Sequence, residues 1–487
     1  MMPPDPHASQ SRDEALLGVF APSLYADHVK VYPRAVQGNF RRIKWLVLGF
    51  CLGLYYALPW LRWDRGPDAP SQALLIDMAG PRAYFFNIEI WPQEVYYITG
   101  LLILGALALF LATALFGRVW CGFTCPQTVW TDLFLQVERW IEGDRNARIR
   151  LDARRLDTDK LLRKTAKHVA WLLIAAATGG AWIMYFQDAP TVTRELFTAQ
   201  ASGATYFFFG LFTLTTYGLA GWAREQVCTY MCPWPRFQAA MQDEHSLLVT
   251  YQGWRGEQRG KHKAGDSWEG RGDCIDCKAC IHVCPTGIDI RNGPQLECIG
   301  CALCIDACDE MMGKVGRPLR LIDFVSLENL DRRAKRLPAI LKLLRTRTVV
   351  YAAMLLLVAA VMATALALRA DLTLTAQQDR NPLYVVLADG AVRNGYVVKV
   401  SNKTREPMRL SLETQGLPQA ELYQAGSTDR RAKLDLEVAP DAVADFHIFV
   451  KAARRNDAGH LQHFDFVLRR ADGREATRLQ TQFAIPG

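Results

Sequence analysis

Five stretches of about 20 mostly apolar residues divide this chain, and they constrain its fold more than any other feature of the sequence. They are approximately Ile43–Leu61, Val95–Phe116, His168–Phe186, Ala204–Ala223 and Thr348–Leu368. A helix of this length crosses the hydrocarbon core of a bilayer and satisfies its own backbone hydrogen bonds there. The second, fourth and fifth stretches carry no charged residue, whereas helices of soluble proteins keep a polar face. The sequence therefore predicts five transmembrane helices.

The basic residues between these stretches predict the orientation of the chain. Lysine and arginine are enriched in the cytoplasmic loops of membrane proteins. Residues 30–44 hold five Lys/Arg, residues 117–167 hold 11 and residues 332–347 hold seven, whereas residues 61–94 hold three and residues 187–203 hold one. Every boundary gives the same orientation, with the N-terminus inside and the C-terminus outside. In a bacterium with two membranes, we expect the protein in the inner membrane with its C-terminal tail in the periplasm.

These observations divide the 487-residue chain into five parts. We expect an N-terminal cytoplasmic segment (1–42), a membrane domain with four helices (43–223) that includes a cytoplasmic loop (117–167), a cytoplasmic domain (224–347), a fifth transmembrane helix (348–368) and a periplasmic domain (369–487). The formal net charge of +8 is small for this length. Because the basic residues flank apolar stretches, they indicate a membrane partner and no nucleic acid.

Eight of the 13 cysteines lie between residues 274 and 308, in two runs. The first run reads C-x2-C-x2-C-x3-C-P, and the second repeats this spacing with Asp309 in place of the proline. In bacterial ferredoxins, three cysteines of such a run bind one 4Fe–4S cluster and the fourth binds the other cluster. The spacing therefore predicts a two-cluster ferredoxin domain, with structural zinc as the weaker alternative. The predicted ligands are Cys274, Cys277, Cys280 and Cys308 for the first cluster, and Cys284, Cys298, Cys301 and Cys304 for the second.

Four further cysteines form two C-x3-C-P motifs, Cys121/Cys125 and Cys228/Cys232, each just past the cytoplasmic end of a predicted helix. Residues four apart share one face of a helix, so each pair can chelate an ion or flank a redox centre. Thiolates favour cuprous copper, zinc or iron–sulfur clusters. We interpret these four as candidate catalytic and copper-binding residues, with packing of reduced cysteines as the alternative, and whether the pairs act jointly or separately stays open. Cys51 is expected to be an apolar packing residue.

The predicted cytoplasmic loop contains a segment with helical periodicity, Pro126–Gly143. Its apolar residues recur every three or four positions, and they are Val129, Leu133, Val137, Trp140 and Ile141. Such a pattern is typical of an amphipathic helix that lies on a membrane surface. We therefore expect a helix on the inner surface of the membrane here.

Beyond Leu368 the apolar residues alternate with a period of two. The clearest examples are Tyr396–Val400, Met408–Leu412, Lys433–Val438, Asp445–Val450 and His463–Arg469. Short alternating segments separated by turn residues predict β-strands, and several in succession predict an all-β sandwich. The sequence after Leu368 shows no catalytic constellation, so we interpret this domain as a docking or assembly module.

In combination, these features resemble the CcoG/FixG/RdxA family of cytochrome c oxidase accessory proteins. The two C-x3-C-P motifs, the segment GDCIDCKACIHVCPTGIDIRNGPQLECIGCALCIDACDEMMGKVGRP and the last apolar stretch before a β-rich tail carry the resemblance, which covers essentially the whole chain. It implies an immunoglobulin-like C-terminal domain and a role in assembling cbb-type oxidases by reducing cupric to cuprous copper. The family's cluster ligands correspond to the eight cysteines above, and Cys121, Cys125, Cys228 and Cys232 match its C-x3-C-P motifs, with a copper or redox role inferred.

Three functions are compatible with these motifs. The first is an oxidoreductase that reduces Cu(II), with copper as substrate or transiently bound ion. The second is an electron-transfer subunit between the quinol pool and a periplasmic reductase, and the third is a redox-sensing assembly scaffold. No G-x-G-x-x-G loop for a dinucleotide occurs in the sequence, so the electrons must come from a separate cytoplasmic donor. The other expected partners are the bilayer and copper chaperones or oxidase assembly factors, and a homodimer is left open.

Overall fold

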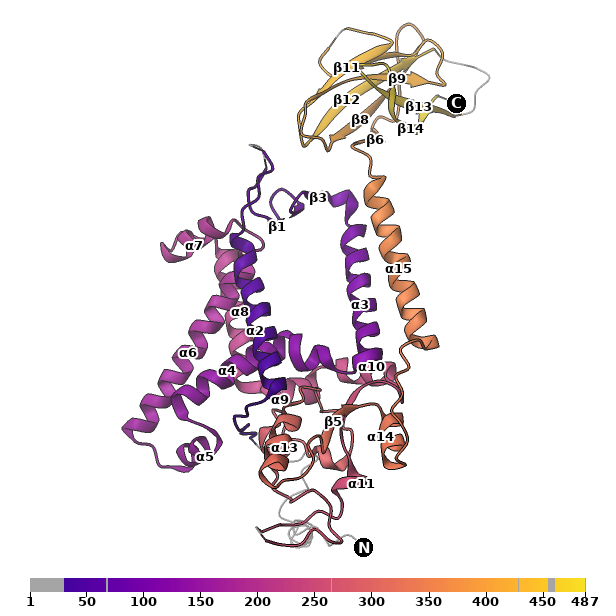
Figure 1. Cartoon of the computed structure of the whole chain (residues 1–487). Coiled ribbons are helices and arrows are strands. Elements are labelled where there is room, and N and C mark those ends of the chain that lie inside the picture. Colours follow the sequence, from indigo (N-terminus) through magenta and orange to yellow (C-terminus); the bar gives the residue numbers. More distant parts are fainter. Residues whose placement is uncertain (1–29, 67–68, 264, 428, 454–459, 487) are drawn as a thin grey trace, which may run out of the picture. The chain divides into compact units, whose positions relative to one another are not determined.

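The computed structural model describes residues 30–66, 69–263, 265–427, 429–453 and 460–486. The chain forms two compact units. The first comprises the residues up to 62 together with 72–358, and the second comprises residues 63–71 together with those from 359 onward. Figure 1 shows the elements of both units. Residues 1–29 of the predicted N-terminal cytoplasmic segment (1–42) lie outside the described residues.

Three helices within the described part of the chain are long and apolar enough to cross a membrane. They are α2 (Asn39–Ala57) with the turn η1 (Leu58–Trp60), the turn η2 (Pro92–Glu94) with α3 (Tyr96–Phe116), and α15 (Thr346–Ala367). They correspond to the first, second and fifth predicted spans. Their apolar side chains are largely exposed, as is expected of side chains that face lipid.

The other two predicted spans are helical, but neither is both long and apolar enough to be counted with these three. The helix α6 (Thr158–Ile183) includes Lys167 and His168, and Thr178-Gly179-Gly180 near its C-terminal end lowers its hydropathy. The helix α8 (Gly203–Thr216) is apolar, yet it has only 14 residues before the chain continues as the π-helix η4 (Tyr217–Ala223). Five transmembrane helices are therefore not confirmed by the described residues.

Close packing joins α6 to α8, which run side by side in Figure 1. A Cβ atom built on Gly179 would lie 2.8 Å from Thr213 Oγ1 and 3.0 Å from the Phe209 carbonyl oxygen. Glycine at this position therefore lets the two helix backbones approach, as small residues do in membrane helices. The remaining elements of this region are the antiparallel sheet of β1 (Leu74–Asp77), β2 (Arg82–Phe85) and β3 (Ile88–Ile90), and the helix α7 (Ala189–Phe197).

The predicted cytoplasmic loop 117–167 is mostly helical. It contains the π-helix η3 (Trp120–Thr124), the helices α4 (Pro126–Glu142) and α5 (Arg145–Ala153), and the first turns of α6. The predicted helix 126–143 is thus present, but the side chains that it buries are not limited to one apolar face. Besides Val129 and Val137, it buries the charged residues Asp132, Glu138 and Glu142, because basic residues of neighbouring elements pair with all three.

The two cysteine runs lie among short elements that begin with α9 (Arg224–Gln226). The elements that follow are η5 (Val227–Met231), α10 (Trp234–Met241), β4 (Leu248–Tyr251), α11 (Gly253–Gly256), α12 (Ala279–Val283), η6 (Ile290–Asn292), α13 (Leu303–Lys314), β5 (Ile322–Val325) and α14 (Leu327–Ala334). The strands β4 and β5 pair in antiparallel fashion. Their side chains Val249, Tyr251 and Ile322 share one apolar core with Cys274, Cys280 and Cys308. The core of this region is therefore built around the cysteines.

The second unit contains two antiparallel sheets. One has the strand order β10-β12-β8-β6 with β7 also paired to β8, and the other has the order β11-β9-β13-β14. Their strands are β6 (Leu372–Gln378), β7 (Val385–Val386), β8 (Val392–Asn402), β9 (Met408–Gln415), β10 (Glu421–Gln424), β11 (Lys433–Val438), β12 (Ala442–Ala452), β13 (Leu461–Arg470) and β14 (Glu475–Ala484). Side chains from both sheets share one core, for example Val398 and Ile448 with Leu412 and Phe466. Each segment predicted from its period of two lies within a strand.

Candidate metal and electron-transfer site

The two cysteine runs fold into loops with the same backbone conformation. After the first cysteine of each run, the second residue (Asp276 or Gly300) and the fourth (Lys278 or Ala302) have φ between 51° and 69°. Three of these four are not glycine, although the left-handed region disfavours other residues. Such conformations persist where the surrounding structure over-determines them, and they concentrate at functional sites. The helices α12 and α13 begin directly after the two loops.

The four cysteines predicted for the second cluster, Cys284, Cys298, Cys301 and Cys304, line one pocket, and Cys280 of the first set reaches the same pocket. Burial raises the pKa of Cys304 well above its ordinary value, and the other three thiols raise it further. Burial likewise raises the pKa of Cys298 to about 12. Buried thiols of this kind bind as thiolates when a cation compensates their charge.

The four cysteines predicted for the first cluster form an equivalent group. Burial raises the pKa of the Cys308 thiol, and Cys280, Cys277 and Cys274 raise it further through their charge. Cys308 comes from α13, whereas the other three come from the first loop and the start of α12. The chain therefore gathers three cysteines of one run with the last cysteine of the other.

The donor sets fit 4Fe–4S clusters, which are held by four thiolates each. Within the described residues, no three His, Cys, Asp or Glu side chains are arranged to hold one metal ion. A cubane keeps its thiolates farther apart than a single ion does, so this spacing is compatible with clusters.

The C-x3-C-P motifs lie on π-helical turns, which are rare and frequent at functional sites. Cys121 belongs to η3 and Cys228 to η5, and both turns end at the second cysteine of the motif, Cys125 or Cys232, where the backbone becomes extended. Burial raises the pKa of Cys121 to about 12, and Cys125, Cys228 and Cys232 add to this effect. The four thiols therefore lie within electrostatic range of one another.

The C-x3-C-P cysteines pack against the loop of the second cluster. Cys121 and Cys228 belong to the same apolar cluster as Cys301 and Cys304. The backbones also approach closely, because a Cβ atom built on Gly122 would lie 2.8 Å from the Gly300 carbonyl oxygen and 3.0 Å from Cys301 Cα. The structure thus brings residues 121–122 into contact with residues 300–301.

Arg118 joins the same two segments through hydrogen bonds. Its guanidinium donates to the carbonyl oxygens of Leu296 and Cys298, and to that of Pro235 at 3.0 Å. It lies three residues before Cys121, whose thiol donates a hydrogen bond of 3.1 Å to Gln238 Oε1. Arg118 therefore fixes the first C-x3-C-P motif relative to the loop of the second cluster.

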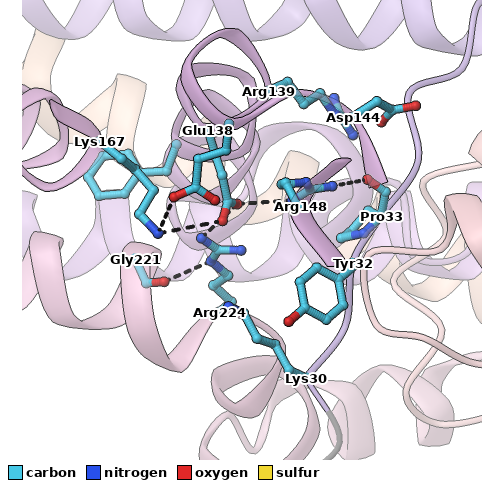
Figure 2. Close-up of polar contacts among 12 residues, drawn as sticks. Lys30, Tyr32, Pro33, Glu138, Arg139, Asp144, Arg148, Lys167, Gly221 and Arg224 are labelled. Carbon is cyan, nitrogen blue, oxygen red and sulfur yellow. Dashed lines mark hydrogen bonds and ion pairs between the residues drawn. The ribbon is translucent and has the colours of Figure 1, made fainter. Parts of the chain in front are cut away.

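A buried network of charges supports the second motif from the other side. Figure 2 shows Glu138 of α4 surrounded by Arg148, Lys167 and Arg224. The Glu138 carboxylate lies 3.1 Å from Arg148 and 3.0 Å from Arg224, and each of these three side chains is at least nine-tenths buried. Arg224 also donates a hydrogen bond of 2.7 Å to the Gly221 carbonyl oxygen. Arg224 lies four residues before Cys228. The network therefore fixes the segment that precedes the second C-x3-C-P motif.

Sequence reasoning named the twelve cysteines of the motifs as candidates but missed the residues that surround them. Arg118, Gly122, Glu138 and Arg224 were not candidates, because a single arginine, glycine or glutamate carries no signal in its spacing. The only feature of the sequence that points to a role for Arg118 and Gly122 is their position at a C-x3-C-P motif. Cys51 lies in α2 and is half-buried, which agrees with a packing role.

Models of known families match three parts of the chain. Residues 223–327 match a 4Fe-4S dicluster domain, and residues 362–486 match the IG-like fold at the C-terminal of FixG. Residues 98–146 match a 4Fe-4S binding domain, and the cysteines in that range are Cys121 and Cys125. The first match covers both cysteine runs and confirms the prediction of iron–sulfur clusters, and the match of residues 362–486 confirms the immunoglobulin-like domain.

The nitrogen fixation protein FixG of Rhizobium meliloti (strain 1021) is 46% identical over 493 residues, which cover 95% of this chain and 94% of FixG. The chain belongs to the FixG/RdxA family. Two proteins of Cereibacter sphaeroides agree with this: RdxB is 53% identical over 79% of this chain and 81% of its own length, and RdxA is 47% identical over 89% and 92%.

Membership of the FixG/RdxA family, the 4Fe–4S domains and the three apolar helices together define the general function. The chain is an iron–sulfur electron-transfer protein of the FixG type, and it is a membrane protein. Its redox activity follows from the 4Fe–4S domains, because such clusters exchange electrons with their partners.

Proposed function

We propose that this protein is a cupric reductase of the membrane, in which electrons pass from the two clusters to Cu(II) at the four C-x3-C-P thiols. The observation that supports this proposal most is the shared apolar cluster of Cys121 and Cys228 with Cys301 and Cys304. Two further contacts tie the same segments together, Gly122 against Gly300 and Arg118 to the Cys298 carbonyl. A direct route thus leads from the second cluster to the thiols.

The chemistry of the route balances for one electron. When bound, the clusters supply electrons one at a time. Each Cu(II) accepts one electron to become Cu(I), and the reduced cluster returns to its oxidised state. The soft thiols of Cys121, Cys125, Cys228 and Cys232 favour Cu(I) over Cu(II). Copper is the substrate of this step, so it binds to the thiols transiently and leaves as Cu(I).

The Cu(I) product is proposed to serve assembly of the copper centre of cbb-type cytochrome c oxidase. Copper chaperones or assembly factors of the oxidase would accept the reduced ion, and a cytoplasmic protein would reduce the clusters. The assignment of the cluster ligands as two crossed sets is part of the same proposal. It is supported by the pocket that Cys284 shares with Cys298, Cys301 and Cys304.

We further propose the bacterial inner membrane as the location and five membrane-spanning helices, with α6 and the α8–η4 segment as the third and fourth. The basic residues of segments 30–44, 117–167 and 332–347 support cytoplasmic placement of the cysteines. The domain limits follow, with the ferredoxin domain in 224–347 and the β-domain of 369–487 in the periplasm. Because the sequence has no cysteine after Cys308, a Ser427→Cys variant of the full chain tests this. Membrane-impermeant maleimide should label it from the outer face of the inner membrane, and labelling only from the cytoplasmic face would contradict the topology.

The copper step is tested with the purified protein after its clusters have been loaded and a reductant supplied. Cu(II) is added with a dye that reports Cu(I), and the rate is compared with that of the variant with all four C-x3-C-P cysteines changed to serine. The matched control is Cys51→Ser, which removes a thiol from α2 and leaves the motifs intact. We expect the control to retain the rate and the fourfold variant to lose it, and equal rates in all three would exclude the proposal.

A further inference from the structure

An apolar cavity of about 540 Å³ lies within the first unit, between α2, α4, α6 and α8. Four aromatic side chains line it, Tyr55, Trp130, Trp182 and Phe212. Tyr55 and Trp130 meet edge to face, with ring centroids 5.2 Å apart, and Trp182 and Phe212 lie 5.3 Å apart. Leu219 also lines the cavity and is 37% exposed, so the cavity reaches the surface of the helices. These walls suit a flat, apolar ring that enters from a membrane.

Two polar groups on the walls are available to a ligand. The Gln127 amide donates hydrogen bonds to the Leu219 carbonyl oxygen at 2.8 Å and to the Arg224 carbonyl oxygen at 3.2 Å. These donations use the NH2 group, and the Gln127 Oε1 atom has no hydrogen-bond donor within the described residues. The Thr216 hydroxyl likewise makes no hydrogen bond within that part of the chain. The cavity therefore offers an acceptor and a hydroxyl to the oxygen atoms of a ring.

The cavity adjoins both C-x3-C-P motifs. Its lining residues Pro126 and Val227 are the immediate chain neighbours of Cys125 and Cys228. The π-helix η4, which supplies Leu219, continues through α9 into η5 with Cys228. A ligand in the cavity would therefore lie close to Cys125 and Cys228.

We propose that this cavity binds the head group of a lipid-soluble quinone or quinol. A substituted benzoquinone ring is flat and enters from the bilayer, and its two oxygen atoms lie on opposite sides. The Thr216 hydroxyl can donate to a carbonyl oxygen of the quinone, and the Gln127 Oε1 atom can accept from a hydroxyl of the quinol. A lipid acyl chain would use the apolar walls but neither polar group, so the ring is the occupant that the walls favour. The assignment concerns binding and is independent of the copper step.

The test uses the purified full-length protein with its clusters loaded, in detergent micelles. A photoreactive azidoquinone labels the protein, and ubiquinone-1 or farnesol is added as competitor, because farnesol supplies an isoprenoid chain without the ring. Three variants are compared: Leu219→Trp fills the cavity, Thr216→Val removes one hydroxyl, and Leu214→Trp is the control on α8. Leu214 is 65% exposed and does not line the cavity.

We expect the label on residues of α4 or α8 and displacement by ubiquinone-1 at concentrations where farnesol has no effect. Leu219→Trp should weaken ubiquinone-1 binding roughly tenfold or more, and Leu214→Trp should leave it unchanged. Thr216→Val should weaken it about fivefold, the usual effect of losing one hydrogen bond. Equal displacement of the label by farnesol would assign the cavity to a lipid chain. Equal weakening of ubiquinone-1 binding by Leu219→Trp and Leu214→Trp would place the binding site outside the cavity. Either result overturns the proposal. Cu(I) formation by the same preparations tests the proposed function separately.

Discussion

Glu138 is a carboxylate buried among cations, so its charge depends on their presence. Burial alone would raise the pKa of Glu138, but Arg224 and Arg148 hold it below the ordinary value. A carboxylate whose pKa is lower in the folded state stabilises the fold at pH values above its unfolded pKa of about 4.3. That stabilisation is lost as the pH falls through the lower pKa of the folded state. The network should therefore fail in acid and persist at neutral pH.

Replacing Glu138 with glutamine should destabilise the protein by about 3 kcal/mol at neutral pH, because it leaves buried cations without their counter-ion. Thermal unfolding in detergent, followed from pH 7 to below pH 4, measures this effect, because the stabilisation is lost only below the unfolded pKa. The difference between the variant and the unmodified protein should shrink at the acid end. The control is Asp159→Asn, a carboxylate that is nearly half exposed, which should change the unfolding temperature little. Equal loss in both variants would show that the burial of Glu138 is unimportant.

Gly122 lies at the contact between a C-x3-C-P motif and the loop of the second cluster. A Gly122→Ala change would push its Cβ atom into the Gly300 carbonyl oxygen, so the two backbones must separate. We expect Cu(I) formation to slow several-fold while the iron content stays the same. The control is Gly105→Ala in α3, where an added Cβ atom meets nothing within 4 Å. An unchanged rate in Gly122→Ala would show that this contact does not matter for electron transfer.

At the scale of single residues, the sequence predicted the kind of chemistry better than it predicted which residues contact one another. Cysteine spacing is a direct consequence of what a cluster needs, so the two runs and the two motifs were recognisable without a structure. That Cys121 packs with Cys301 depends on long-range contacts that the spacing does not encode. Arg118 was missed for the same reason, since its partners are backbone carbonyl groups more than 100 residues away.

At the scale of elements, α13 and α2 are linked through Asp306. The Asp306 carboxylate accepts hydrogen bonds from the backbone N–H groups of Phe40 at 3.3 Å and Arg41 at 2.8 Å. Those are orphan donors in the first turn of α2, where a negative charge also complements the helix dipole. Because Asp306 lies between Cys304 and Cys308, the loops of the ferredoxin domain are tied to α2.

Asp306→Ala should weaken the start of α2 by about 1 kcal/mol, the usual effect of losing a helix cap. Hydrogen exchange of the amides in the first turn of α2 should become faster, because two N–H groups lose their acceptor. Glu310→Ala provides the control on the same helix, since Glu310 pairs with Lys314 and is 42% exposed. If exchange in α2 is equally fast in both variants, Asp306 does not hold the helix.

Elements whose apolar residues recur with a simple period were predicted well. Elements whose conformation or buried residues depend on contacts with other parts of the chain were not. The strands of the β-domain follow a period of two because one face of each sheet is buried. Helix 126–143 was also recognised, but its buried acids pair with cations of α2, α5, α6 and α9, which the periodicity of one helix cannot show. The π-helices η3, η4 and η5 were not foreseen, because their wider turns leave no pattern in the sequence.

For the whole molecule, the number of iron atoms separates two interpretations of the C-x3-C-P cysteines. Two clusters in the ferredoxin domain require about eight iron atoms per chain. The match of residues 98–146 to a 4Fe-4S binding domain raises the alternative that the four cysteines hold iron as well. We expect about eight iron atoms per chain, and the same number in the variant with all four cysteines changed to serine. A higher content that falls in this variant would assign these thiols to a further cluster.

The central claim is that electrons leave the clusters through the four thiols to copper. It is tested most directly by mixing fully reduced protein with Cu(II) in a stopped-flow instrument and following reoxidation of the clusters. The account predicts rapid reoxidation with one Cu(I) formed for each electron lost, and slow reoxidation when Cys121, Cys125, Cys228 and Cys232 are serine. Reoxidation at the same rate in both proteins would contradict it.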